Sequence, residues 1–194
     1  IVGSVHAQFD DIQEMFDVCG HPPYTSYLFL GNFVNYGDRN ISTITLLFSL
    51  ALKYPQYFYL LRGAHESRKM TRDCGLYQEV VNRYGTPRAW EALMNAFDTL
   101  PLAARVCGQF FCLSGGISRN IVTLAQIDNF NRFVEVPTTE AWSSLMWNIP
   151  NASVKDYTAI DKGVGSYYGK DQLDFFLKAN VLPSIVYSRS LCPN

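Results

Sequence analysis

The chain has 194 residues, which is enough for one domain with a sizeable core. Its apolar fraction of 48% and charged fraction of 17% lie within the range of globular proteins. The 16 basic and 17 acidic residues give a net charge of -1, which offers no electrostatic case for binding nucleic acid or an anionic membrane. No apolar run reaches membrane-spanning length.

The cysteine pattern favours a reducing environment. There are five cysteines, an odd number, and none forms a C-x-x-C pair. Core thiols therefore explain them better than a disulfide framework does. No signal peptide is visible at the start of the chain. We expect an intracellular, cytoplasmic protein.

Strand and helix patterns alternate along the first half. Phe9, Ile12 and Phe16 have helical spacing, and Gly20 with the prolines beyond it is a typical helix stop. Ser42 is the expected cap of the next helix. The predicted elements are a strand at 1–5, a helix at 9–18, a strand at 27–30, a helix at 42–53 and a strand at 57–61.

The second half continues this alternation. Pro87 stands at a favoured helix start, and Trp90, Met94 and Phe97 follow it at core spacing. The predicted elements are two helical pieces at 67–84, a helix from 87, a hairpin at 106–113 turning at Gly108, a short helix from 123, a loop-rich stretch at 137–161, a helix at 171–179 and a strand at 184–187. This order predicts an α/β architecture with helices covering sheet layers.

Four predicted strands end in a glycine flanked by polar residues. They end in Gly3-Ser4-Val5-His6, Gly31-Asn32-Phe33-Val34-Asn35-Tyr36-Gly37, Gly63-Ala64-His65-Glu66 and Ser114-Gly115-Gly116. Strand ends of this kind usually direct their polar residues into one crevice at the carboxyl edge of a sheet. The chain is therefore expected to build a site there.

With these motifs the chain resembles the phosphoprotein phosphatase family, the calcineurin-like serine/threonine phosphatases of types 1, 2A and 2B. Further segments extend the resemblance over essentially the whole chain, including residues 27–31, 97–104, 115–118, 135–137 and 163–167. It implies an α/β fold of two packed mixed β-sheets flanked by helices, a four-layer sandwich, here truncated at both ends. We expect residues 1–194 to form a single phosphatase-like domain.

Members of that family hydrolyse phosphoserine and phosphothreonine esters with two divalent metal ions such as manganese, iron or zinc. A water that bridges both metals attacks phosphorus, and a histidine paired with an aspartate protonates the leaving alkoxide. The resemblance places six metal-ligand positions at Ser4, His6, Asn32, Ala64, Ser114 and Arg189.

Five of these six positions are substituted. The family pattern G-D-x-H-G is Gly3-Ser4-Val5-His6-Ala7 here, so only the histidine is kept. In G-N-H-E the asparagine is replaced by Ala64, and in H-G-G the histidine is replaced by Ser114. In R-A-H-E the final histidine is replaced by Arg189.

The functional residues of the family pattern G-D-x-V-D-R-G are substituted as well. The metal-bridging aspartate is Asn32, the aspartate that orients the catalytic histidine is Asn35, and the phosphate-gripping arginine is Tyr36. The catalytic histidine itself remains as His65, and the second phosphate-binding arginine falls at Lys162.

These residues are poor metal ligands, and one imidazole with a neutral amide does not hold two divalent cations. Without metals the water nucleophile is lost, because bulk water is far too weak an acid to provide hydroxide at neutral pH. We therefore expect no resident metal or other cofactor and no functional catalytic residue, with His65 and Asn35 vestigial. Carboxylates and cations have disappeared together, which indicates a pocket re-formed without metal.

Three functions stay open. The leading one is an inactive pseudophosphatase that serves as a structural or protein-binding subunit of a larger assembly, with protein partners. The second is an active phosphatase that uses His6 and His65, although these residues are more simply explained as hydrogen-bonded core histidines. The third is a non-hydrolysing phosphate or phosphopeptide binder that uses Arg189 and Lys162; alternatively, Arg189 pairs with a carboxylate or a carbonyl.

Overall fold

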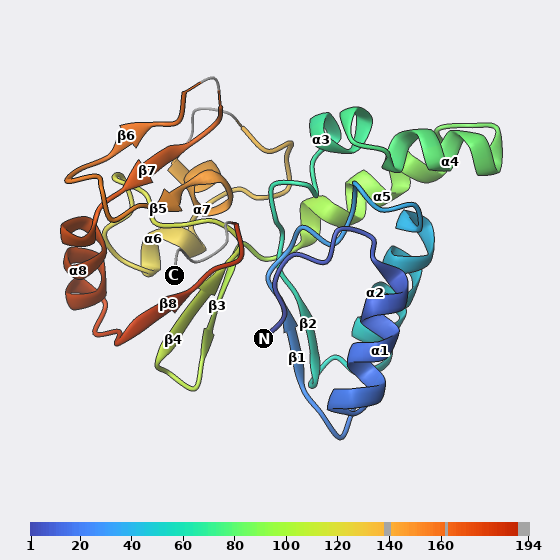
Figure 1. Cartoon of the computed structure of the whole chain (residues 1–194), viewed down its shortest axis with the longest axis horizontal. Helices are drawn as coiled ribbons and strands as arrows, with labels where there is room; N and C mark the ends of the chain where they lie inside the picture. The colour runs from blue at the N-terminus through green and yellow to red at the C-terminus, as the bar shows by residue number, and fades with distance from the viewer. Residues whose placement is uncertain (138–140, 162, 190–194) are drawn as a thin grey trace.

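The computed structural model describes residues 1–137, 141–161 and 163–189. Its helices flank small sheets in an α/β arrangement (Figure 1), which confirms the predicted fold class. In chain order the elements are α1 (Phe9–Cys19), β1 (Tyr27–Phe29), α2 (Asn40–Lys53), β2 (Phe58–Leu60), α3 (Arg68–Asp73), α4 (Leu76–Tyr84), α5 (Arg88–Thr99), β3 (Ala103–Val106), β4 (Phe110–Leu113), α6 (Ala125–Asp128), a 3-10 turn (Ala141–Ser143), α7 (Ser144–Trp147), β5 (Ile149–Pro150), β6 (Thr158–Ala159), β7 (Ser166–Tyr168), α8 (Lys170–Ala179) and β8 (Ser184–Val186).

The strands of the described residues form three small sheets rather than two. Strands β1 and β2 pair in parallel, β4 lies between antiparallel β3 and parallel β8, and β7 lies between β5 and β6. The strand expected at residues 1–5 is reduced to a single bridge from Val2 to Phe29. The N–H of Val2 donates to Leu28 O at 2.8 Å, and the N–H of Leu30 donates to Val2 O at 2.9 Å.

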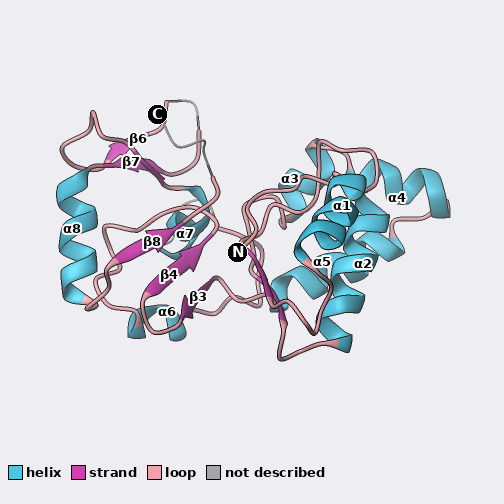
Figure 2. Cartoon of the chain, turned by 60° about the horizontal axis from the view of Figure 1, so that its bottom comes forward, coloured by secondary structure: helices cyan, strands magenta, loops and turns pink. Residues whose placement is uncertain are grey.

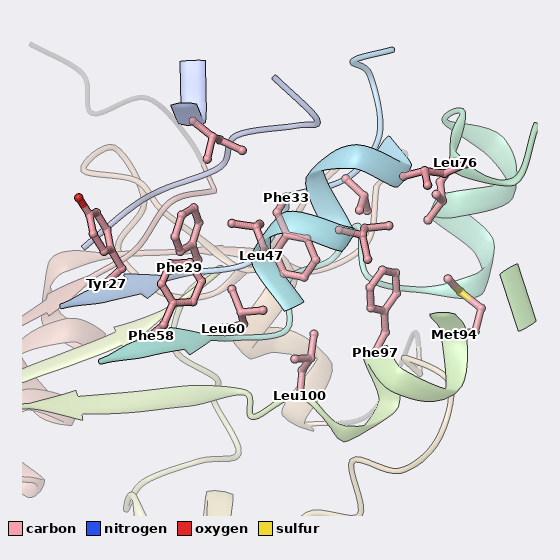
Figure 3. Close-up of a cluster of buried hydrophobic side chains, with 14 of the residues drawn as sticks. Tyr27, Phe29, Phe33, Leu47, Phe58, Leu60, Leu76, Met94, Phe97 and Leu100 are labelled. Atoms are coloured by element: carbon pink, nitrogen blue, oxygen red, sulfur yellow. The ribbon is translucent and has the colours of Figure 1, made fainter. Parts of the chain in front are cut away.

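The first core fills the half that contains α1 to α5 and the β1–β2 sheet. Figure 3 shows Phe29 and Phe58 side by side on the two strands, with the rings 5.3 Å apart, and Phe33 against Phe97 of α5. Leu47 of α2 is fully buried in the same cluster. Burial of each such side chain stabilises the fold by about 1.5–3 kcal/mol.

A second core lies in the other half, under α6, α7 and α8. It is built around Trp142, Tyr168 and Phe176, all of them buried. Figure 2 shows the two halves side by side, and Figure 1 shows β1 and β2 near their junction. A smaller cluster that includes Leu28, Leu61 and Cys112 connects the β1–β2 sheet to β4 across this junction.

Helix α2 does not begin where its sequence pattern indicated. Ser42 was the expected cap, but the helix starts at Asn40. The carboxylate of Glu79, on α4, accepts the backbone N–H groups of Asn40 at 2.8 Å and Ile41 at 2.9 Å. A tertiary contact therefore supplies the cap, and local sequence could not reveal it.

The remaining differences also depend on long-range pairing. The hairpin extends back to Ala103, although its turn does use Gly108. The stretch at 137–161 was expected to be loop, but it contains α7 together with β5 and β6, both of which pair with β7. None of the helices in the described part of the chain is long and apolar enough to cross a membrane.

Candidate functional site

The predicted site residues come together where four segments end. Asn32 follows β1, His65 follows β2, Ser114 follows β4 and Arg189 follows β8. These loops meet at the junction of the two halves (Figure 1). The sequence therefore predicted correctly that the motifs share one location.

Two glycines let the loops after β1 and β2 touch. A Cβ atom on Gly31 would collide with the backbone of Gly63, so the two chains pack backbone to backbone. The buried carboxylate of Glu66 holds both loops, since it accepts N–H groups from Asn32 at 2.7 Å, Gly63 at 2.8 Å and Phe33 at 3.0 Å. Burial raises the pKa of Glu66 to about 7, although these N–H donors lower it.

Several non-glycine residues of the site have a left-handed backbone. The φ angles are 43° at His6, 58° at Ala7, 55° at Asn32, 72° at Asn35 and 65° at Tyr36. Such a conformation costs about 1–2 kcal/mol for most residues, and less for asparagine. The surrounding packing therefore imposes the shape of these loops at a cost in stability.

Both polar atoms of the Asn32 side-chain amide form hydrogen bonds within the chain. Its Oδ1 accepts the backbone N–H of His65 at 3.1 Å, and its Nδ2 donates to Ser4 Oγ at 3.2 Å. The Ser4 hydroxyl in turn donates to Ser188 O at 3.1 Å. Two family ligand positions are thus joined by hydrogen bonds to each other and to the backbone.

The contact of Asn35 determines the tautomer of His65. Asn35 Oδ1 accepts the backbone N–H of Leu76 at 3.4 Å, so its Nδ2 faces His65 and donates to Nδ1 at 3.0 Å. The proton of the neutral His65 ring therefore lies on Nε2. Burial, with the charges of His6 and Arg189, lowers the pKa of His65 to about 3, so the ring is neutral near pH 7.

His6 has the opposite tautomer. Its Nδ1–H donates to Val34 O at 3.2 Å, which leaves Nε2 as an acceptor. Burial lowers the pKa of His6, and Arg189 lowers it further against the effect of the Val34 bond. The rings of His6, Tyr36 and His65 form a ring cluster, with centroids 4.8 to 5.1 Å apart.

Arg189 lies over the ring of Trp147, with Cζ 4.3 Å from the ring centroid. Within the described residues it forms no ion pair and no hydrogen bond, and its Nε is buried without a partner. The expectation that Arg189 pairs with a carboxylate or carbonyl is therefore wrong for this part of the chain. Lys162, its predicted companion, lies outside the described residues.

The last two ligand positions are buried. Ala64 brings no donor atom, and the Ser114 hydroxyl has no hydrogen-bond partner in the described chain. Trp147, the ring that Arg189 contacts, is not among the site residues expected from the sequence.

We tested these atoms as ligands for the two metal ions that the resemblance implies. Asn32 Oδ1 is occupied, Arg189 brings a positive charge, and no carboxylate stands at any of the six positions. Among these six positions, and counting contacts within the described residues, only His6 Nε2 and the Ser114 hydroxyl are free to act as ligands. Across the described ranges no group of three or more His, Cys, Asp or Glu residues is placed to hold a metal. The residues do not fit two divalent cations.

Comparison with known proteins identifies the scaffold. The family model described as calcineurin-like phosphoesterase matches residues 1–188. The chain is 38% identical over 193 residues to the PP2A-like serine/threonine-protein phosphatase PPG1 of Candida albicans, covering 99% of this chain and 46% of that protein. It is 39% identical over 192 residues to a catalytic subunit of protein phosphatase 2A from Dictyostelium discoideum, covering 99% and 62%.

A solved structure agrees with these sequence matches. It is a protein serine/threonine phosphatase from Saccharomyces cerevisiae with similarity to human phosphatase PP5, and it superposes with a TM-score of 0.93 at 30% identity. The match covers 98% of this chain and 60% of that one. The chain thus spans about half to three fifths of the length of these relatives.

Proposed function

Because this chain belongs to the calcineurin-like phosphoesterase family, we propose that it is a pseudophosphatase: a single phosphatase-like domain that does not hydrolyse phosphate esters and serves as a structural or protein-interaction subunit. The observation that carries the proposal is the state of Asn32. At the position of the metal-bridging carboxylate, its amide is neutral and bonded at both ends, to His65 and to Ser4.

The proton donor supports the same proposal. In the family a charged aspartate stabilises the imidazolium of the catalytic histidine. Here Asn35 donates to Nδ1 of His65, so that nitrogen has no proton to share and no negative charge stands beside it. With a pKa of about 3, His65 does not hold a second proton at neutral pH.

Retention of the scaffold fits a role in binding. Gly31 and Gly63 still pack against each other, and the site loops still have their strained backbone. Strain of this kind lasts only where the surrounding structure imposes it. The fold has therefore kept its shape while the metal ligands changed.

Turnover and metal content test the proposal together. We expect the purified chain, incubated with manganese, to retain well below two equivalents per chain and to release no phosphate from a phosphoserine peptide. An active serine/threonine phosphatase measured in parallel serves as the positive control. Two bound equivalents with turnover that His65→Asn abolishes would establish the alternative, an active phosphatase.

Protein partners are part of the proposal. A groove of about 480 Å³ lies between the β1–β2 sheet and β3, and its lining is largely apolar, including Tyr27, Leu28, Leu61 and Val106. We propose that apolar side chains of a partner protein fill it. Light scattering after size exclusion provides the test, and a stable, monodisperse monomer of this chain would contradict the partner role.

We also propose a reducing, cytoplasmic location. Four of the five cysteines lie in the described part of the chain, and all four are free: Cys19, Cys74, Cys107 and Cys112. Free thiols on exposed positions such as Cys19 and Cys107 are typical of a compartment that keeps them reduced. Microscopy of a tagged full-length protein tests this location, and secretion would contradict it.

A further inference from the structure

The guanidinium of Arg189 is a cation without a counter-charge in the described residues. Its Nε is buried and unpaired, while its terminal nitrogens, which also have no partner there, are not fully buried. Its contact is the face of Trp147. Burial of an unpaired charge is unfavourable, so an anion bound to the guanidinium would stabilise the buried Arg189 side chain.

The groups around Arg189 do not neutralise it. His6 and His65 are uncharged, and Ser4 and Asn32 are neutral and bonded to each other. The buried carboxylate of Glu66 is directed at backbone N–H groups of the two glycine loops. Aspartates at the positions of Ser4 and Asn32, as in the family, would add negative charge that suits cations. Here both positions are neutral, and Arg189 adds a positive charge.

A second donor is available on His65, whose ring contacts His6 in the same site. Since Asn35 occupies Nδ1 of His65, the ring presents its Nε2–H, which has no partner in the described chain and is not fully buried. The charge of Arg189 acts on this ring and on Tyr36. A guanidinium fork satisfies two oxygens of an anion, and His65 offers a donor for a third. Three terminal oxygens are a property of a phosphate group, whereas a carboxylate has only two.

We propose that this group of residues binds a phosphate group without metal ions, with the Arg189 fork on Trp147 as its anchor and His65 Nε2–H as a second donor. The inference rests on the proposed function, since it concerns the same site in a chain that does not hydrolyse the bound ester. The phosphate belongs to a phosphoserine or phosphothreonine peptide or is the free ion, and the two sources are separated by experiment.

Calorimetry in the presence of a metal chelator tests the site. The probes are a phosphoserine peptide, its unphosphorylated twin, inorganic phosphate and acetate. We expect binding of the phosphopeptide at one per chain, no binding of the twin, and weaker binding of acetate than of phosphate. Inorganic phosphate that binds as well as the phosphopeptide identifies the free ion as the ligand. Absence of binding by both phosphate probes, or acetate that binds equally well, overturns the proposal.

Substitutions locate the binding on Arg189. Arg189→Met keeps the side chain long and apolar against Trp147, and we expect it to weaken phosphate binding on the order of tenfold or more. Arg189→Lys keeps the charge but loses the fork, and we expect an intermediate effect. Arg119→Met is the matched control, because Arg119 also lies on an aromatic ring, that of Tyr157, but pairs with Asp156.

The controls keep each outcome interpretable. If Arg189→Met does not fold, as judged by circular dichroism, Arg189→Lys and the change of tryptophan fluorescence on phosphate addition, compared with that of Trp147→Phe, decide the question. Binding that is unchanged in a folded Arg189 variant overturns the proposal and leaves the proposed function intact. Phosphate release from the peptide with manganese contradicts the proposed function instead, whatever the chelated chain binds.

Discussion

Two neutral histidines with opposite tautomers define the site at the residue scale. His6 donates from Nδ1 to Val34 O, whereas His65 accepts at Nδ1 from Asn35. Their rings meet edge to face, 4.8 Å apart. The amide at position 35 is the cause for His65, because an ionised carboxylate there would accept a hydrogen bond from Nδ1–H instead of donating one to Nδ1.

This arrangement predicts a pH-dependent contribution of His65 to stability. Its pKa is about 3 in the folded chain and 6.5 when unperturbed, so the unfolded chain binds more protons between these values. The free energy of unfolding should therefore fall as the pH falls below 6.5, by about 1.4 kcal/mol per pH unit for this group.

Urea denaturation of the native chain and of His65→Gln measures this contribution at pH 7.5 and at pH 5. These values lie roughly one unit or more to either side of the unperturbed pKa. Groups common to both chains, Glu66 among them, cancel in the difference. The native chain should lose stability relative to the variant at the lower pH. An equal difference at both pH values would show that the His65 ring is not held neutral.

At the element scale, the start of α2 shows how a helix end depends on another helix. Glu79 of α4 accepts the N–H groups of Asn40 and Ile41 and also the side-chain amide of Asn40. A carboxylate at a helix start satisfies free N–H groups and interacts favourably with the helix dipole. One side chain therefore both caps α2 and fixes α4 against it.

Glu79→Gln tests this cap. We expect a loss of about 1 kcal/mol in the free energy of unfolding, because the uncharged amide accepts these bonds less strongly. Glu91→Gln in the first turn of α5 is the matched control, since Glu91 is exposed and should change stability by less than about 0.5 kcal/mol. Equal effects of the two substitutions would show that the contact to α2 contributes nothing specific.

At the scale of the whole molecule, buried charges join the two halves. Arg62, which is fully buried after β2, pairs with Asp98 of α5 at 2.7 Å and donates to Arg132 O and Val134 O of the segment beyond β4. Arg68 also pairs with Asp98, at 2.7 Å. The loop of the second half is thereby bound to the helices of the first.

Asp98→Asn should be strongly destabilising, by about 3 kcal/mol, because it leaves the buried Arg62 cation without its carboxylate. The same change in an exposed pair, Asp156→Asn opposite Arg119, should cost less than about 1 kcal/mol. Chemical denaturation of both variants measures the difference. If Asp98→Asn is as mild as Asp156→Asn, the buried network does not hold the halves together.

Much of the candidate site could be predicted from the sequence because strand ends carry it. The glycine-flanked motifs predicted that Asn32, His65 and Ser114 would share one location, and the family resemblance added Arg189. In the structure the backbone N–H of His65 donates to Asn32 Oδ1, and the N–H of Ser188, next to Arg189, donates to Ser114 O. The contacts of Arg189 could not be predicted in this way. Its ring partner, Trp147, is 42 residues away in the chain, and only packing of α7 against the loop after β8 brings them together.

The sequence by itself determined the fold class, the position of the site and the residue types in it, because apolar periodicity and turn residues act locally. Only the tertiary structure decided how those residues are used. In the folded chain both polar atoms of the Asn32 amide form hydrogen bonds, and Asn35 sets the tautomer of His65. Arg189 has no carboxylate partner within the described residues. These outcomes depend on which donors and acceptors meet across the fold, and on how far burial shields these groups from water.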